Sequence, residues 1–322
     1  MQPQFADPCL RRFNMITVDY VNRGGTRGSV PDEYSFQDVA RDVATFMDAL
    51  RLPPVIVYGA SLGGMIAVQL GLERPEKVRG LFVVATLGGV EVPAVAAGRQ
   101  QVFDLWAIEM EKRARGERDD AALEAIHHGG NQLAWGAWNA GKTPLLRAIS
   151  QLALKWALRQ WDFAHIRECR ITTVEMFTKV RPFAPNALGT LATHGIPVSV
   201  AYGGADIAYP AEMYEGFASQ MRDCGVSVQT HCVEEAPHWV STTHPEVLNP
   251  IMADFILDRW NSMGGQPPPV VAPPVGRKTL ATPFDDELRQ AGWTPEEEEE
   301  EEETVGVAPV DSSRLAVDGL RV

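Results

Sequence analysis

The chain has 322 residues, of which 45% are hydrophobic, so it can bury a sizeable core as one large domain or two small ones. Its formal net charge of −13 disfavours nucleic acid as a partner. Much of this charge comes from an acidic run near the C-terminus, at 296–303, and the rest of the chain is only mildly acidic.

Neither a membrane anchor nor an export signal is predicted. No apolar run approaches the roughly 20 residues that cross a bilayer, and the first residues lack the apolar centre of a signal peptide. The four cysteines show no C-x-x-C spacing, which favours free thiols in a reducing compartment. We therefore expect a soluble, cytoplasmic protein.

The first predicted elements are a strand, a loop and a helix. Phe13–Tyr20 is strand-like, and a Gly-rich loop follows at 22–28. Ser35 is a predicted N-cap with Asp38 three residues later, and apolar residues then recur at helical spacing as far as Leu50. This amphipathic helix is expected to pack against a sheet.

Four later runs are short, apolar and rich in β-branched residues, which is typical of buried parallel strands. They are Val55–Tyr58, Val78–Thr86, Ile196–Tyr202 and Val226–Val233. A helix is predicted over Leu62–Glu73, between the first two runs. Strands that alternate with helices predict an α/β fold with a mostly parallel, doubly wound sheet.

The chain is expected to divide into a domain at 1–263 and a tail at 264–322. Within the domain, the pattern from about 93 to 191 is helical and rich in tryptophan, which predicts an inserted helical cap. The tail is Pro-rich and then acidic, so it is predicted to be disordered. Its stretch Phe284–Trp293 is expected to be solvated charge rather than a lasting helix.

Gly59-Ala60-Ser61-Leu62-Gly63 is a G-x-S-x-G pentapeptide between a predicted buried strand and a predicted helix. In that context the motif makes a tight turn that exposes the serine hydroxyl, and the absence of side chains on the two glycines leaves room for it. The helix N-terminus behind Ser61 also favours developing negative charge. The alternative is an ordinary Gly-rich turn with a serine N-cap; we take Ser61 as a nucleophile.

A serine nucleophile needs a base and a carboxylate that orients the base. Asp206 follows a predicted strand, at the strand end where ligand sites of open α/β sheets gather, and is the candidate acid. His238 follows the last predicted strand and is the candidate base. A turn aspartate and a hydrogen-bonded loop histidine are the alternatives.

Six other histidines compete with His238: His127, His128, His165, His194, His231 and His244. His231 lies within a strand pattern, and His244 lies at a helix start. His127 and His128 are adjacent, so they point to different faces of a helix, and no carboxylate has matching spacing. No metal and no cofactor are therefore expected.

These motifs together resemble the α/β-hydrolase superfamily. The resemblance covers most of Phe13–Trp260 and is carried by YGASLGGM, ERPEKVRGLFVVAT, GGADIAYP and APHWVSTTHPEVLNPIMADFI. It implies Ser61 as nucleophile, Asp206 as acid, His238 as base, and the backbone N–H of Leu62 as one oxyanion-hole donor.

The chain departs from this family pattern at its start. Members of the superfamily have an earlier strand that ends in an HG-type loop and supplies the second oxyanion donor. In the family's sheet that strand lies between those matching Ile16–Tyr20 and Val55–Tyr58, so the expectation is either that these two strands pair directly or that the form is N-terminally truncated.

Three functions are expected to compete. The first is a serine hydrolase that cleaves an ester or related acyl bond of a small, apolar molecule through an acyl-enzyme. The second is an acyltransferase of the homoserine O-acetyltransferase type, because ASLGGM resembles the turn that carries the nucleophile in such enzymes. The third is a non-catalytic binding protein of the same fold. The expected partner is a small-molecule acyl substrate.

Overall fold

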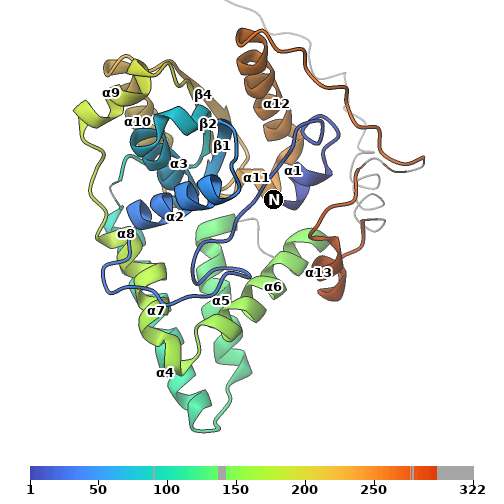
Figure 1. Ribbon diagram of the computed structural model, residues 1–322. Coiled ribbons are helices and arrows are strands. Elements are labelled where there is room, and N and C mark those ends of the chain that lie inside the picture. The colour runs from blue at the N-terminus through green and yellow to red at the C-terminus, as the bar shows by residue number, and fades with distance from the viewer. Residues whose placement is uncertain (90, 137–142, 276, 278, 296–322) are drawn as a thin grey trace, which may run out of the picture.

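The fold is built around a parallel sheet of four strands (Figure 1). The computed structural model describes residues 1–89, 91–136, 143–275, 277 and 279–295. The strands are β1 (Val55–Ala60), β2 (Val78–Val84), β3 (Val198–Gly203) and β4 (Val228–Val233), and they lie side by side in chain order. All three pairings are parallel, so the predicted fold class is confirmed, and so are the four predicted strands to within two residues at each end.

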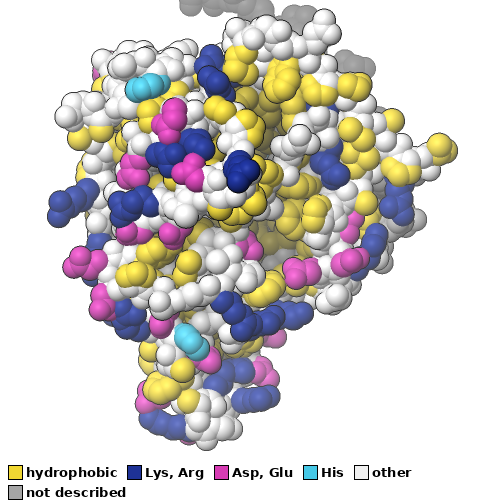
Figure 2. All heavy atoms as spheres, in the orientation of Figure 1, with side chains coloured by type: hydrophobic (Ala, Val, Ile, Leu, Met, Phe, Trp, Pro, Cys, Tyr) yellow, Lys and Arg dark blue, Asp and Glu magenta, His cyan; other side chains and the backbone are white. Residues whose placement is uncertain are grey.

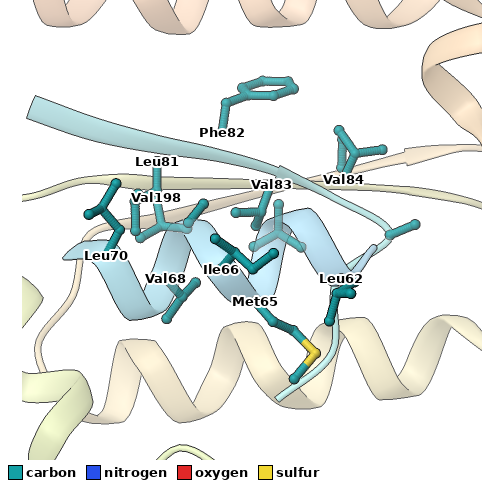
Figure 3. Close-up of a cluster of buried hydrophobic side chains, with 14 of the residues drawn as sticks. Leu62, Met65, Ile66, Val68, Leu70, Leu81, Phe82, Val83, Val84 and Val198 are labelled. Carbon is teal, nitrogen blue, oxygen red and sulfur yellow. The ribbon is translucent and has the colours of Figure 1, made fainter. Parts of the chain in front are cut away.

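The two faces of the sheet are covered by different helices. The helix α3 (Leu62–Glu73) packs on the face that carries Leu81 and Val83, whereas Phe82 points to the opposite side (Figure 3). On that opposite side Phe82 meets Phe255 of α12 (Pro245–Ser262), with ring centroids 5.8 Å apart. The strand β2 is therefore buried on both faces, which explains its almost continuous apolar sequence.

The helix α2 (Phe36–Ala49) begins where the sequence predicts. Ser35 and Asp38 form a capping box, in which the Asp38 carboxylate accepts the N–H of Ser35 at 2.8 Å. Its buried face carries Val39, Ala40, Ala44 and Met47. Leu50 is more than half exposed, because the helix ends before it.

The predicted strand at Phe13–Tyr20 is wrong. These residues are irregular, and Ile16 and Val18 are exposed to 56% and 41%. Among the described residues β2 is the only strand that pairs with β1. The expected direct pairing of Phe13–Tyr20 with β1 therefore does not occur. An extended segment needs a neighbouring strand to satisfy its N–H and C=O groups, and here no described strand lies beside it.

A group of helices follows β2 and lies below the sheet in Figure 1. It contains α4 (Pro93–Ala114), α5 (Asp120–Trp135), α6 (Pro144–Gln160), α7 (Ile166–Arg170), a π-helical turn (Ile171–Glu175) and α8 (Met176–Thr178). Phe103, Trp106, Leu123 and Ile126 form a core of their own there.

Two further helices complete the region around the sheet. The helix α9 (Pro185–Thr193) lies beside α3, where Leu191 packs close to Gly71. The helix α10 (Ala211–Asp223) buries Tyr214, Phe217, Ala218 and Met221 in the same core as the sheet.

The described part of the tail packs against the body. Asp285–Gln290 forms α13, and Leu288 and Trp293 are buried with Leu145 and Ala148 of α6. The expectation of solvated charge at Phe284–Trp293 is therefore corrected, because the apolar residues of this stretch pack on α6. The rest of the predicted disordered tail, 296–322, lies outside the described residues.

The N-terminus lies next to this tail. The helix α1 (Gln2–Ala6), which was not predicted, places Phe5 against Phe284 with ring centroids 5.2 Å apart. The carbonyl of Ala6 accepts the N–H of Leu280 at 2.9 Å. Of the helices that the structure describes, none has the length and apolar character to cross a membrane.

Candidate functional site

Ser61 lies on a strained turn between β1 and α3. Its backbone has φ 52° and ψ −120°, a conformation that side-chain-bearing residues rarely adopt. The N–H of Ser61 donates to Val84 O at 2.7 Å, which ties the turn to the end of β2. The serine is therefore held rigidly at the carboxyl end of the sheet, where the motif predicts it.

The glycines around Ser61 are needed for space at two positions. A Cβ on Gly59 would lie 2.2 Å from Gly63 O, and one on Gly64 would lie 1.8 Å from Thr86 Oγ1. A Cβ on Gly63 would meet nothing within 4 Å. The expectation that both motif glycines relieve crowding therefore holds for Gly59 and not for Gly63, whereas Gly64 permits the close packing of α3 on β2.

Asp206 lies in the loop after β3, as predicted. Its Oδ1 accepts the N–H groups of Ala208 at 2.9 Å and Tyr209 at 3.1 Å. The preceding Gly203 passes so close to the histidine loop that a Cβ there would lie 2.1 Å from Ala236 O. This close approach brings the carboxylate to the histidine, since only glycine fits at that crossing.

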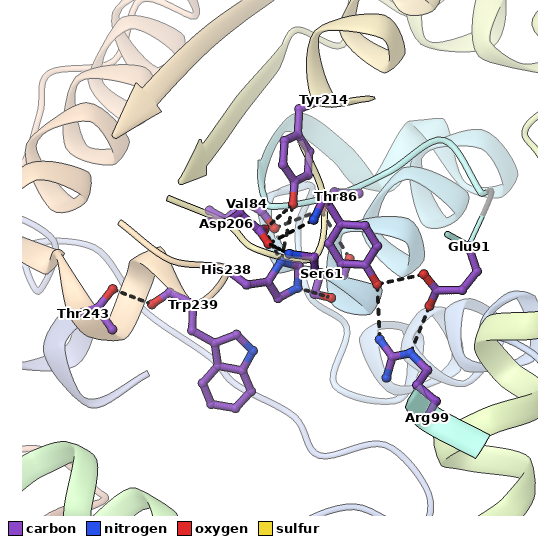
Figure 4. Close-up of polar contacts among 12 residues, drawn as sticks. Ser61, Val84, Thr86, Glu91, Arg99, Asp206, Tyr214, His238, Trp239 and Thr243 are labelled. Atoms are coloured by element: carbon purple, nitrogen blue, oxygen red, sulfur yellow. Dashed lines mark hydrogen bonds and ion pairs between the residues drawn. The ribbon is translucent and has the colours of Figure 1, made fainter. Parts of the chain in front are cut away.

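The structure brings Ser61, His238 and Asp206 together (Figure 4). His238 Nε2 lies 2.9 Å from Ser61 Oγ, and His238 Nδ1 lies 2.7 Å from Asp206 Oδ2. His238 is 4% exposed, and the carboxylate of Asp206 is fully buried. A histidine held in this way can take the proton of a serine hydroxyl while the carboxylate stabilises the imidazolium that forms.

The environment keeps Asp206 ionised. Burial alone raises the pKa of the carboxyl, but hydrogen bonds from His238 and Tyr214, the charge of protonated His238 and the backbone N–H of Ala208 outweigh burial, and the pKa is lowered below its ordinary value. The hydroxyl of Tyr214 donates to Asp206 Oδ2 at 2.6 Å. Burial first, and then the adjacent Asp206 carboxylate, raises the pKa of Tyr214, so this phenol stays a donor.

A small pocket of about 30 Å³ opens beside Ser61. Its lining is mostly apolar: Ser61, Leu62, Met65, Ala85, Leu87, Gly89, Glu91, Phe177, Val180 and Tyr209. Leu62 occupies the first position of α3, where a backbone N–H has no partner within the helix. This N–H is available to an anion in the pocket.

Sequence reasoning missed the polar neighbours of this site. Tyr214 comes from α10, Tyr209 from the loop after β3, and Glu91 and Arg99 from the start of the helical region. Tyr209 lies within the motif GGADIAYP but was given no role, and no motif links the four residues. Their only sequence signal is that both tyrosines follow Asp206 closely. The competing histidines lie elsewhere: His127, for example, bonds to Ser150 Oγ at 2.8 Å.

No group of three or more His, Cys, Asp or Glu side chains in the described ranges is arranged to hold a metal ion. The tryptophans of the helical region are packing residues where they are buried. Trp106 donates from Nε1 to Trp161 O at 2.8 Å within the core of that region.

Known proteins support the fold. A family model described as alpha/beta hydrolase fold matches residues 1–245. The protein named "Putative carbamate hydrolase RutD" of Serratia proteamaculans is 39% identical over 72 residues, which is 22% of this chain and 27% of that protein. The RutD protein of Variovorax paradoxus is 31% identical over 83 residues, 26% of this chain and 31% of its own length. The match thus spans about a third or less of these relatives.

Two solved structures share the architecture. A "putative aryl esterase" from Burkholderia cenocepacia has a TM-score of 0.59 and 17% identity, and the alignment covers 81% of this chain and 85% of that one. A meta-cleavage product hydrolase from Pseudomonas fluorescens IP01 has a TM-score of 0.54 and 14% identity, covering 74% and 78%. Together with the family model over most of its length, these likenesses show that the chain belongs to the alpha/beta hydrolase fold family.

Proposed function

We propose that the protein is a serine hydrolase that cleaves an ester or related acyl bond of a small molecule. The observation that carries this proposal is the continuous hydrogen-bonded series Ser61–His238–Asp206, with the His238 and Asp206 side chains buried, beside a mostly apolar pocket. In this proposal Ser61 is the nucleophile, His238 the general base and Asp206 the residue that orients the base.

The proposed reaction has two halves. Ser61 Oγ attacks the acyl carbon while His238 Nε2 takes its proton, and the backbone N–H of Leu62 stabilises the oxyanion. His238 then gives the proton to the leaving group, and an acyl-enzyme remains. In the second half His238 activates water, which attacks the acyl carbon and releases the acid.

The comparisons support hydrolysis in general terms. The relatives that match over 72 to 83 residues carry the name carbamate hydrolase, and esterases are among the structural neighbours. The pocket lining is mostly apolar, which favours a small, largely apolar substrate. Lys, Arg, Asp and Glu side chains are interspersed on the face seen in Figure 2, which is not the basic surface that nucleic acid requires.

Labelling with a fluorophosphonate, followed by mass spectrometry, tests this proposal. We expect one adduct on the wild type and none on Ser61→Ala. Ser150→Ala is the matched control, because Ser150 is also bonded to a histidine, yet lies outside the pocket. It should keep the adduct.

Two results would redirect the proposal. If folded wild-type protein takes no label, the chain is better described as a binding protein of this fold. If it takes the label but passes the acyl group of an ester to added alcohols in preference to water, it is an acyltransferase.

A further inference from the structure

A charged pair is built into the wall of the pocket that contains Ser61. Glu91 Oε2 lies 2.9 Å from Arg99 Nε, and the two side chains are only 8% and 14% exposed. Figure 4 shows the pair beside the triad. Glu91 lines the pocket, and Arg99 lies at the start of α4 with its guanidinium 3.6 Å from the centroid of the Phe177 ring.

Tyr209 connects this pair to the triad. Its hydroxyl donates to Glu91 Oε1 at 2.9 Å, its ring lies 5.1 Å from the His238 ring, and its N–H donates to Asp206. The carboxylate of Glu91 is thus held in a fixed place relative to the reacting serine.

A Glu–Tyr–Arg cluster that only holds elements together does not have to be buried. Glu215 accepts the hydroxyl of Tyr202 at 2.7 Å and lies 3.8 Å from Arg222, which repeats the Glu–Tyr–Arg arrangement. That second cluster is near the surface, and its Glu215 and Arg222 side chains are 43% and 41% exposed. Moving such charges out of water into a pocket wall is unfavourable before the pairing is counted.

Glu91 retains capacity for a ligand. A carboxylate offers about four acceptor positions. The described contacts use two on Oε1, from Tyr209 and the N–H of Val92, and one on Oε2, from Arg99. Among the described contacts Oε2 accepts only from Arg99, and Glu91 lines the pocket, so the carboxylate has capacity for a further N–H or O–H donor there.

We propose that Glu91 selects substrates whose acyl group is short and carries an N–H donor, so that the nitrogen lies against the carboxylate while the carbonyl carbon lies at Ser61. This inference rests on the proposed function. The pocket beside Ser61 is small, at about 30 Å³, which favours a short acyl group.

The covalent step is the same as for any ester. A bond forms between Ser61 Oγ and the carbonyl carbon, and the bond from that carbon to the leaving oxygen breaks. The serine proton moves to His238 Nε2 and then to the leaving group. The N–H hydrogen bond to Glu91 forms on binding and transfers no proton.

Two pairs of p-nitrophenyl esters of matched size test the proposal. Carbamate against acetate replaces a methyl group by a neutral NH₂, and glycinate against propionate replaces it by an ammonium group. Second-order acylation rate constants, corrected for spontaneous hydrolysis, give the donor-to-methyl ratio for each pair. In Glu91→Gln we expect at least one ratio to fall about 10-fold, the size expected for one hydrogen bond to a charged group. The pair that responds tells a neutral donor from a cationic one.

Glu215→Gln is the matched control and should leave both ratios at their wild-type values. Equal ratios in the wild type and Glu91→Gln would overturn the inference. If no ester reacts and no fluorophosphonate adduct forms, the proposed function has failed. In that case NMR is used to compare the affinity of Ser61→Ala for methyl carbamate and for glycinamide with its affinity for methyl acetate, which tests the role of Glu91 without the reaction. The same measurement is used if the melting temperature of Glu91→Gln is too low for kinetic assays.

Discussion

Asp206 is the most heavily contacted side chain of the site. Its carboxylate accepts four hydrogen bonds, from His238, Tyr214 and the N–H groups of Ala208 and Tyr209. Because a buried carboxylate without donors is costly, these contacts make its ionised form the stable one. Tyr214 contacts Asp206 and His238, so in the proposed mechanism it is a positioning residue.

Replacing Tyr214 by Phe is expected to destabilise the fold by about 1.5–3 kcal/mol at pH 7, since one hydrogen bond to a charged group is lost. A carboxyl whose folded pKa is depressed adds stability that is full above its unfolded pKa of about 3.9 and is lost as pH falls through the folded pKa. The difference between wild type and Tyr214→Phe should therefore narrow below about pH 4. Urea unfolding at a series of pH values measures it.

Tyr202→Phe is the control for this prediction. Tyr202 stacks on Tyr214 and also donates to a carboxylate, that of Glu215, which is far more exposed. Its effect should be smaller, because exposed hydrogen-bonded groups exchange readily with water. An equal loss of unfolding free energy in both variants would mean that the burial of Asp206 does not determine how much the tyrosine hydrogen bond stabilises the fold.

Gly64 allows α3 to lie close to the segment that follows β2. Gly64 faces Thr86 with no room for a Cβ, whereas Gly63, one residue earlier on the same helix, faces open space. Ser61 is placed by this contact, because Thr86 Oγ1 also reaches Ser61 O at 3.3 Å.

Gly64→Ala should therefore cost about 1–3 kcal/mol through overpacking, and should slow fluorophosphonate labelling of Ser61 by shifting the turn. Gly63→Ala should be neutral or slightly stabilising, because alanine favours the helix over glycine by up to about 1 kcal/mol. Thermal unfolding of the two variants checks the contrast. Equal melting temperatures would show that the Thr86 side chain moves aside for the added Cβ at little cost in stability.

The N-terminal helix, the helical region and the end of the described tail are tied together. Trp293 and Leu288 are each 3% exposed against α6, and Arg11 of the N-terminal segment donates to Ala281 O at 3.0 Å. This contact is remote from Ser61, since none of these residues lines the pocket. It should therefore affect the integrity of the chain more than its chemistry.

Trp293→Ala should release the tail. Truncation of a buried Trp costs about 3–5 kcal/mol, which is expected to exceed the free energy that holds this peripheral cluster in place. We expect limited proteolysis to cut faster between residues 264 and 283, while the rate of Ser61 labelling stays unchanged. Val275→Ala is the control, because Val275 is fully exposed in the same segment. Unchanged cleavage in Trp293→Ala would show that the tail is held by other contacts.

Local patterns in the chain predicted several of the elements and the three residues of the candidate site. Period and capping predicted α2, α3 was predicted after the Ser61 turn, short apolar runs predicted four strands, and the G-x-S-x-G motif made Ser61 the candidate nucleophile. Asp206 and His238 were predicted because ligand residues of parallel sheets follow the carboxyl ends of strands. These features depend on neighbours in sequence or on a rule of topology.

Only the tertiary structure decided the features that depend on distant partners. Phe13–Tyr20 has the composition of a strand, yet it remains irregular, because a strand exists only when another backbone pairs with it. The tail helix forms because α6 offers an apolar surface to Leu288 and Trp293. Tyr214 and the Glu91–Arg99 pair carry no local pattern, and only folding brings their polar atoms within hydrogen-bonding distance of their partners at the site.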